Sequence, residues 1–134
     1  MADNGLVTLT SVHDAKTTLD RLTGVLQAKG VTIFATIDHA SGAASVGLPL
    51  RPTTVVIFGN PAAGTPLMQA AQTAGIDLPL KALVWEAADG TTHLTYNDPA
   101  WIVARHALGS EAQKAVTALG AAIAAFAQHA TTQV

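Results

Sequence analysis

The sequence predicts an α+β domain of two layers, with a mixed or mostly antiparallel sheet and helices packed on one face of that sheet. Three observations support this prediction. Short alternating or β-branched segments recur along the chain, helical periodicity appears between them, and Asp89-Gly90 marks a tight turn between two of the strands. The expected order is β-α-β-β-α-β-β-α-α, which is neither a regular βα alternation nor an all-β pattern.

The first part of the chain is predicted to form a strand, a helix and a second strand. Residues 6–10 alternate as a strand, and Ser11 with Asp14 resembles a capping box for a helix that ends just before Gly30. Residues 31–38 are then predicted to form a β-branched strand. The apolar stripe expected on the helix is Ala15, Leu19, Leu22 and Leu26. The side chains expected on one face of the second strand are Val31, Ile33, Ala35 and Ile37.

The middle of the chain begins with the segment His39 to Pro52, which is rich in Ser, Gly and Ala. We expect an irregular loop here, and loops of this length in compact domains are usually functional or mobile. Thr53 to Phe58 is apolar on both faces from Val55 onward, which is typical of a central strand. Asn60-Pro61 or Thr65-Pro66 then begins a helix, because proline suits the first helical position.

Residues 81–87 and 91–96 are predicted to form a hairpin around Asp89-Gly90. Pairing Ala88 with Thr91 sets the register, and a slip of one residue would move every side chain to the opposite face. The opposed pairs expected from this register are Glu86 with His93, Trp85 with Leu94, and Leu83 with Tyr96.

This register predicts different roles for the two faces of the hairpin. Trp85 and Tyr96 would both belong to the core. Glu86 and His93 would face each other on the other side, where they could stabilise the sheet or act as a general acid/base couple.

The C-terminal part of the chain is predicted to hold two helices. Asn97-Asp98-Pro99 caps a short helix that ends near Gly109, and Trp101 on this helix could line a pocket. Ser110 with Gln113 then begins the last helix. Its expected apolar stripe is Val116, Leu119, Ile123 and Phe126. The alanines on its remaining surface have two explanations, high helix propensity or a smooth face for close packing against another helix.

Composition limits the classes of protein that the chain can belong to. Its 134 residues fit one domain over 1–134, and 49% are hydrophobic while only 12% are charged. So few charges favour a homodimer, because an interface hides apolar surface. The net charge of −2 and the scattered basic residues argue against nucleic-acid and membrane partners.

The absence of cysteine excludes disulfides, thiolate chemistry and cysteine-ligated metals. The first residues lack the basic and apolar regions of a signal peptide, and no apolar tract is long enough to span a membrane. We therefore expect a cytoplasmic protein.

Residues from about 34 to 106 carry a series of short motifs in a constant order. These motifs are Phe34-Ala35-Thr36-Ile37-Asp38-His39, Gly47-Leu48-Pro49-Leu50-Arg51-Pro52-Thr53, Ile57-Phe58-Gly59-Asn60-Pro61, Gly64-Thr65-Pro66-Leu67-Met68, Leu78-Pro79-Leu80-Lys81-Ala82-Leu83-Val84-Trp85-Glu86, Tyr96-Asn97-Asp98-Pro99 and Arg105-His106. Together they resemble the family called domain of unknown function 302. The resemblance implies a compact, dimeric α+β domain that occurs alone or fused to others and has no catalytic assignment. It also marks His39, the segment Tyr96-Asn97-Asp98-Pro99 and His106 as polar positions of interest.

The preferred functional hypothesis is a homodimeric module that binds a small molecule or an ion. The residues expected to hold the ligand are His39, Arg51, Asn97, Asp98 and His106, with Arg51 suited to an anionic group. One alternative is a small hydrolase or isomerase that uses His39 or His106 as acid and base. Another alternative is a purely structural or oligomerisation module.

Other chemistries find less support in the pattern of residues. The turn at residues 59–66 has the glycine spacing of a phosphate loop, but no lysine follows Gly64 and two prolines remove N–H donors, although a small anion at the helix N-terminus remains an alternative. Ser45, His39 and Asp98 could be drawn as a catalytic triad, but no nucleophile elbow surrounds the serine. No histidine pair has the i, i+4 spacing of a helical metal site. The groups from which a metal or haem site would have to assemble are His39, His106, His93, Asp38, Asp98 and Glu86.

Overall fold

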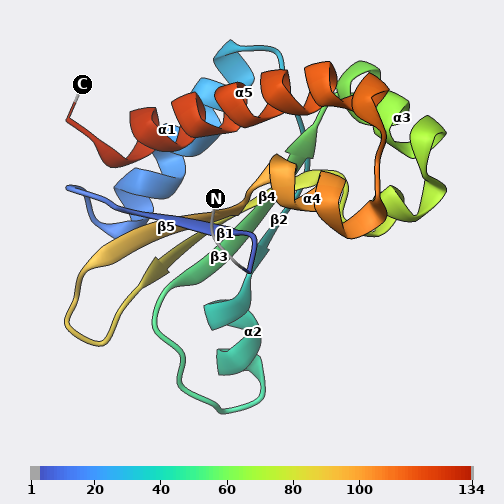
Figure 1. Cartoon of the computed structure of the whole chain (residues 1–134). Helices are drawn as coiled ribbons and strands as arrows, with labels where there is room; N and C mark the ends of the chain where they lie inside the picture. Colours follow the sequence, from blue (N-terminus) through green and yellow to red (C-terminus); the bar gives the residue numbers. More distant parts are fainter. Residues whose placement is uncertain (1–3, 134) are drawn as a thin grey trace.

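The computed structural model describes residues 4–133, which form one antiparallel sheet of five strands with helices on one of its faces (Figure 1). The strands are β1 (Leu6–Thr10), β2 (Thr32–Asp38), β3 (Thr53–Gly59), β4 (Leu80–Glu86) and β5 (Thr92–Asn97). They lie in the spatial order β1-β5-β4-β3-β2, and every neighbouring pair is antiparallel. The predicted two-layer α+β class is confirmed.

The helices are distributed unevenly around the sheet. They are α1 (Ala15–Ala28), α2 (His39–Ser45), α3 (Pro61–Ala70), α4 (Pro99–His106) and α5 (Gln113–Thr131), with short 3-10 turns η1 (Gln72–Ile76) and η2 (Ser110–Ala112). Figure 1 shows α1 and α5 crossing above the strands, whereas α2 lies on the far side of the strands from them. One face of the sheet is therefore covered by helices, and the other face is largely open.

The core lies between the covered face of the sheet and the two long helices. Val56 and Phe58 of β3 are almost completely buried there against Leu22 and Leu26 of α1 and Ile123 of α5. The apolar stripes predicted for both helices are therefore found facing the core. Burial of these side chains is the main force that holds the two layers together.

Local signals placed several helix ends correctly. Asn60 caps α3 with a hydrogen bond that its side chain accepts from the N–H of Ala62, and Asp98 caps α4 in the same way. The capping box predicted at Ser11 is wrong, because the cap of α1 is Asp14, which accepts a hydrogen bond from the N–H of Thr17 at 2.8 Å. That N–H holds the pKa of the Asp14 carboxyl below its usual value. No side-chain cap precedes α5, which instead follows η2.

The segment His39 to Pro52 is not an irregular loop throughout, because its first half forms α2. The carboxylate of Asp38 accepts a hydrogen bond from the N–H of Ser41 at 2.9 Å and so caps this helix. None of its seven residues is buried. A helix that buries no apolar stripe leaves no periodicity in the sequence, so the prediction missed it.

The predicted hairpin register is wrong by one residue. Val84 pairs with Leu94 and Trp85 pairs with His93, because the connecting loop is longer than a two-residue turn. The N–H of Ala87 donates to the carbonyl of Thr91 at 2.8 Å, so three residues lie between them. One of the three, Gly90, has φ +86°, the left-handed conformation that a three-residue loop requires.

The register shift moves Trp85 out of the core. Val84 and Leu94 face the helices instead, and Tyr96 remains buried as predicted. Trp85 lies on the open face, where its ring centroid is 4.6 Å from that of His93. Glu86 pairs with Thr92, so the predicted pair of Glu86 with His93 does not form.

A β-bulge in β2 changes which side chains share a face. Pairing with β3 shifts between Ile33 and Ala35, which leaves Phe34 as the extra residue. Ile33 pairs with buried Phe58 and faces the core, whereas Ala35 and Ile37 lie on the open face. The predicted single face of residues 31–37 is therefore wrong.

Trp101 of α4 packs inside the molecule instead of lining an open pocket. A Cβ atom at Gly5, whose φ is +78°, would lie 2.6 Å from the indole of Trp101. Only glycine therefore allows the chain before β1 to rest on this ring. The guanidinium of Arg105 lies 5.3 Å from the ring centroid on another side.

Candidate functional site

The open face is the surface of the sheet that carries the side chains turned away from α1 and α5. Its central row consists of cross-strand partners. From one edge of the sheet to the other they are Ile37, Val55, Leu83, Thr95 and Thr8. Three of these five side chains are apolar, which is unusual for a sheet surface without a covering layer.

A hollow of about 400 Å³ lies on this face, and we call it the open-face hollow. Its lining consists of Leu6, His39, Val55, Lys81, Leu83, Thr95, Tyr96 and Asn97. Two of the residues that the sequence singled out, His39 and Asn97, therefore border the same depression. Lys81 is a third polar group with them, and the floor between is apolar.

The register of the strands shows how the polar groups are arranged around the open-face hollow. Lys81 pairs with Ile57, near the end of β3, and Asn97 lies on the adjoining strand at the same end of the sheet. His39 directly follows Asp38, which pairs with Thr54 near the start of β3. Positions 57 and 53 of one strand are about 13 Å apart. The hollow therefore has Lys81 and Asn97 at one end and His39 toward the other.

The Tyr96 phenol stays uncharged beside this site at physiological pH. Burial raises its pKa above the usual value, and the negative charge of Asp98 acts in the same direction. Lys81 is therefore the group in the lining that carries a full charge near neutral pH, since the ordinary pKa of lysine lies far above 7 and that of histidine just below it.

Two other predicted ligand residues lie outside the lining of the open-face hollow. The Nε of Arg51 donates a hydrogen bond to the carbonyl of Glu86 at 3.1 Å, and Arg51 borders a separate, shallow hollow beside α2. The carboxylate of Asp98 accepts the N–H of Ala100 at 2.9 Å as the cap of α4. Both side chains therefore have structural partners.

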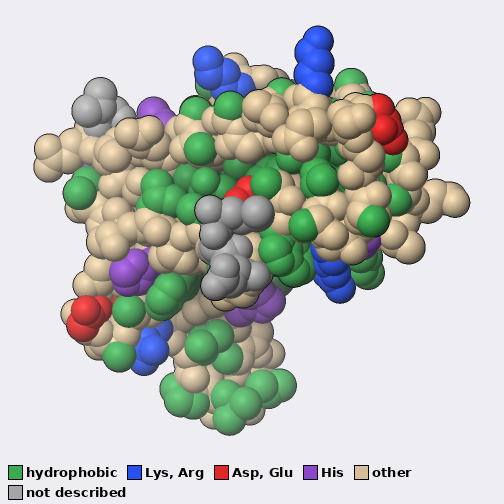
Figure 2. Space-filling model, in the orientation of Figure 1, with side chains coloured by type: hydrophobic (Ala, Val, Ile, Leu, Met, Phe, Trp, Pro, Cys, Tyr) green, Lys and Arg blue, Asp and Glu red, His purple; other side chains and the backbone are tan. Residues whose placement is uncertain are grey.

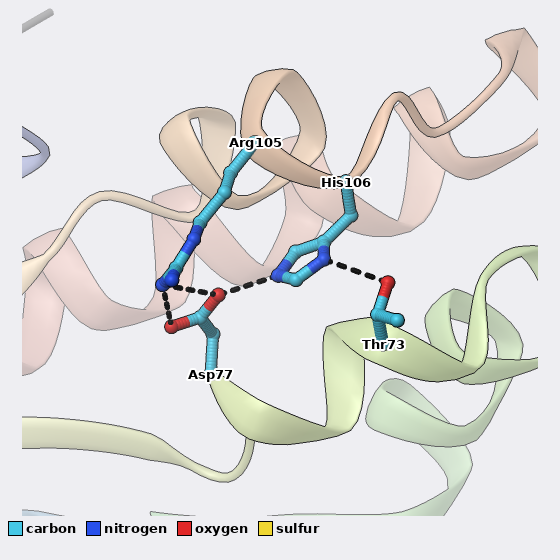
Figure 3. Close-up of polar contacts among 4 residues, drawn as sticks. All are labelled: Thr73, Asp77, Arg105 and His106. Atoms are coloured by element: carbon cyan, nitrogen blue, oxygen red, sulfur yellow. Dashed lines mark hydrogen bonds and ion pairs between the residues drawn. The ribbon is translucent and has the colours of Figure 1, made fainter.

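The fifth predicted residue, His106, belongs to a different cluster (Figure 3). Its side chain is 7% exposed, and its Nε2 lies 2.5 Å from a carboxylate oxygen of Asp77. Its Nδ1 lies 2.9 Å from the hydroxyl of Thr73. Arg105 donates to both oxygens of the Asp77 carboxylate, at 2.9 and 3.2 Å. The structure thus places His39 and His106 at separate sites.

The partners of His106 determine where its proton lies. A carboxylate only accepts hydrogen bonds, so Nε2 carries a hydrogen that it donates to Asp77. In the neutral ring, Nδ1 then accepts a hydrogen bond from the hydroxyl of Thr73. The result is a hydroxyl–imidazole–carboxylate series that joins the end of α4 to η1, and we call it the His106 relay. It can brace these two elements, and it has the order of groups that activates a hydroxyl.

Residues 4–133 hold no group of three or more His, Asp or Glu side chains that could bind a metal ion. The six groups named from the sequence as metal candidates are dispersed in the structure. His93, for instance, stacks on Trp85, and Asp38 caps α2.

Sequence reasoning missed Lys81, Thr73 and Asp77. Lys81 did leave a signal, because it interrupts an apolar strand on the same face as Leu83 and Trp85, and the correct register would have put it beside Asn97. Thr73 and Asp77 left no signal. They belong to a short 3-10 turn and its C-cap, and they meet His106 only through tertiary packing.

These features define a two-layer α+β module with one helix-covered and one open sheet face. Residues 7–126 match the family described as domain of unknown function DUF302, and the chain belongs to this family. The crystal structure of the uncharacterised conserved protein DUF302 from Bacillus stearothermophilus has the same fold, with a TM-score of 0.83 at 18% sequence identity. The similarity covers 94% of this chain and 98% of that one.

The chain is also similar to part of several larger proteins. It is 45% identical over 117 residues to proteins named fluoride-specific ion channel FluC 1 from Brucella suis biovar 1 and from Brucella abortus biovar 1. The match covers 87% of this chain but only 46% and 43% of those proteins, so the chain spans less than half of their length. Within residues 4–133, no helix combines the length and apolar character needed to cross a membrane.

Proposed function

We propose that this chain is a homodimeric module that binds a small amphipathic organic anion in the open-face hollow. One observation carries the proposal. Polar groups lie at both ends of a hollow whose floor is apolar, with Lys81 and Asn97 at one end and His39 toward the other. A volume of about 400 Å³ lies within the range of small-molecule sites in proteins.

The chemistry of the lining indicates how such a ligand would bind. The ammonium group of Lys81 suits a carboxylate, and the amide of Asn97 can donate a second hydrogen bond to it. Val55 and Leu83 form the apolar floor, which suits an aliphatic or aromatic body. The imidazole of His39 could then contact the far end of the ligand. An elongated acid fits this arrangement better than an inorganic ion.

The homodimer is proposed from the distribution of exposed apolar side chains. Leu6 and Ile37 are 45% and 42% exposed on the open face, and Val46, Leu48 and Leu50 are still more exposed on α2 and the loop after it. Figure 2 shows the same concentration of hydrophobic side chains over the part of the molecule that holds α2, with charged side chains few and scattered. A second copy packed by two-fold symmetry would cover this surface and close the hollow.

The Lys81→Gln variant tests the ligand site. We expect a series of straight-chain carboxylates to bind with increasing affinity from acetate to octanoate, because a longer chain buries more of the apolar floor. Removing the ammonium group should weaken octanoate binding about 10- to 100-fold, since a charge-assisted hydrogen bond contributes about 1.5–3 kcal/mol. Isothermal titration calorimetry measures both effects.

Lys114→Gln is the matched control, because Lys114 lies exposed on α5 and away from the open face. It should bind octanoate as the unmodified chain does. Octanoate that fails to bind, or that binds equally to both variants, would contradict the proposed site and leave the purely structural alternative.

A second candidate function rests on a separate observation, the His106 relay. Its three groups have the order that allows an imidazole to remove a proton from a hydroxyl while a carboxylate stabilises the imidazolium. Thr73 is exposed, so its oxygen is accessible to an electrophile such as an ester carbonyl. This candidate is a small esterase-type hydrolase in which Thr73 is the nucleophile and His106 the base.

A fluorophosphonate reagent tests this second function. We expect a covalent adduct on Thr73, detected by peptide mass spectrometry, and its loss in His106→Gln, which removes the base. The peptide that contains Thr10 is an internal control, because that hydroxyl lies 3.4 Å from a His93 nitrogen outside the relay. If Thr73 reacts no faster than Thr10, the relay is a brace between α4 and η1 and not a catalytic device.

A further inference from the structure

A second hollow lies on the other side of the molecule's functional surface, next to the start of α3, and we call it the α3 pocket. Its volume is about 300 Å³. It is lined by Phe34, Gly59, Asn60, Pro61, Ala63, Gly64, Thr65, Met68, Leu78, Pro79, Leu80 and Leu119. None of these residues lines the open-face hollow. We propose that the α3 pocket binds a small uncharged apolar molecule, about the size of a single substituted aromatic ring.

The lining excludes a charged ligand. It contains no acidic or basic side chain, and its polar members are Asn60 and Thr65. The Asn60 side-chain oxygen already accepts a hydrogen bond from the N–H of Ala62 at 2.8 Å. A charged group would lose its hydration here without a compensating partner. An apolar ring would instead exchange water contacts for contacts with Met68, Leu78 and Leu119.

Two glycines keep space open along the wall of the α3 pocket. A Cβ atom at Gly64 would lie 4.0 Å from both Leu78 and Met68, so a side chain there would extend into the pocket region. A Cβ atom at Gly59 would approach Pro79 to 3.4 Å and Phe34 to 3.6 Å. Met68 is flexible and polarisable, so it can adapt to the shape of an aromatic guest. Apolar cavities of even smaller size bind benzene in other proteins.

The volume and the enclosure argue for a small molecule as the occupant. A space of about 300 Å³ lies at the lower end of ligand sites and holds one ring with a short substituent. Phe34, the extra residue of the β2 bulge, is 51% exposed and borders the pocket, so its ring can pack against a guest.

The experiment compares toluene, indole and benzoate as ligands of the whole chain by ligand-observed NMR and by thermal denaturation. We expect toluene and indole to bind and to raise the melting temperature. Benzoate has a ring of the same size as toluene but carries a charge, so we expect it to bind the α3 pocket at least tenfold more weakly.

Gly64→Leu is the decisive variant, because its side chain would fill the α3 pocket. Position 64 is inside a helix, where leucine is favoured over glycine, so we expect the fold to be retained and toluene binding to fall at least tenfold. Gly24→Leu is the matched control, since a Cβ atom at this position of α1 meets nothing within 4 Å. It should bind toluene normally.

Three outcomes would overturn the inference. Toluene could fail to bind the unmodified chain, or it could bind a folded Gly64→Leu variant unchanged. It could also lose affinity equally in Lys81→Gln, which would assign the binding to the open-face hollow. Normal toluene binding in Lys81→Gln, together with its loss in Gly64→Leu, supports the α3 pocket whatever the outcome for octanoate.

Discussion

Replacing Phe58 with alanine should lower the free energy of unfolding by about 3–5 kcal/mol. Phe58 lies in β3 at the centre of the core, is 1% exposed, and meets the ring of Phe126 edge-on with centroids 6.5 Å apart. The substitution removes the whole ring and leaves a cavity that the sheet and α5 cannot close. The loss is a large share of the 5–15 kcal/mol that typically stabilises a domain.

Urea denaturation followed by circular dichroism, at one protein concentration, measures this effect. Phe34→Ala is the control, because it makes the same chemical change at a side chain that is 51% exposed. We expect it to change the free energy of unfolding by less than about 1 kcal/mol. Equal losses in the two variants would contradict the position of the core described here.

Replacing Ile37 with lysine should separate the proposed homodimer into monomers. Ile37 lies in the central row of the open face, next to Val55, and is 42% exposed in the single chain. In a two-fold interface each substitution occurs twice, and each would remove about 1.5–3 kcal/mol of apolar burial and introduce a charge. We therefore expect the dissociation constant to rise at least about a hundredfold.

Sedimentation velocity over a range of concentrations measures this change. Ile76→Lys is the matched control, because Ile76 is 73% exposed in η1 and lies off the open face. It should leave the dimer intact. A chain that sediments as a monomer at all concentrations would reject the dimer, and equal dissociation in both variants would reject the open face as its interface.

The candidate site was predictable where it depended on residues at the ends of secondary-structure elements. His39 and Asn97 stood out as polar residues directly after predicted strands, and both border the open-face hollow. Lys81 was overlooked because the hairpin was aligned one residue out of register. Neighbouring residues of a strand point to opposite faces, so that error exchanged the open face for the core.

His106 was singled out correctly as a polar residue of interest, but its surroundings were beyond sequence reasoning. Asp77 and Thr73 lie 29 and 33 residues from His106 along the chain. They reach it because α4 packs against η1, and short-range patterns carry no information about such a contact. The same holds for the α3 pocket, whose lining comes from five separate segments of the chain.

Local signals in the amino-acid sequence were enough to specify the α+β class, the helix stripes and most helix caps, because these depend on residues within a few positions of one another. Three-dimensional packing specified the hairpin register, the faces of β2 and the separation of His39 from His106. A three-residue loop, a bulge at Phe34 and the docking of α4 each depend on which distant surfaces best bury their apolar side chains. Burial is non-directional and acts between segments remote in the chain, so it selects among alternatives that local chemistry leaves equal.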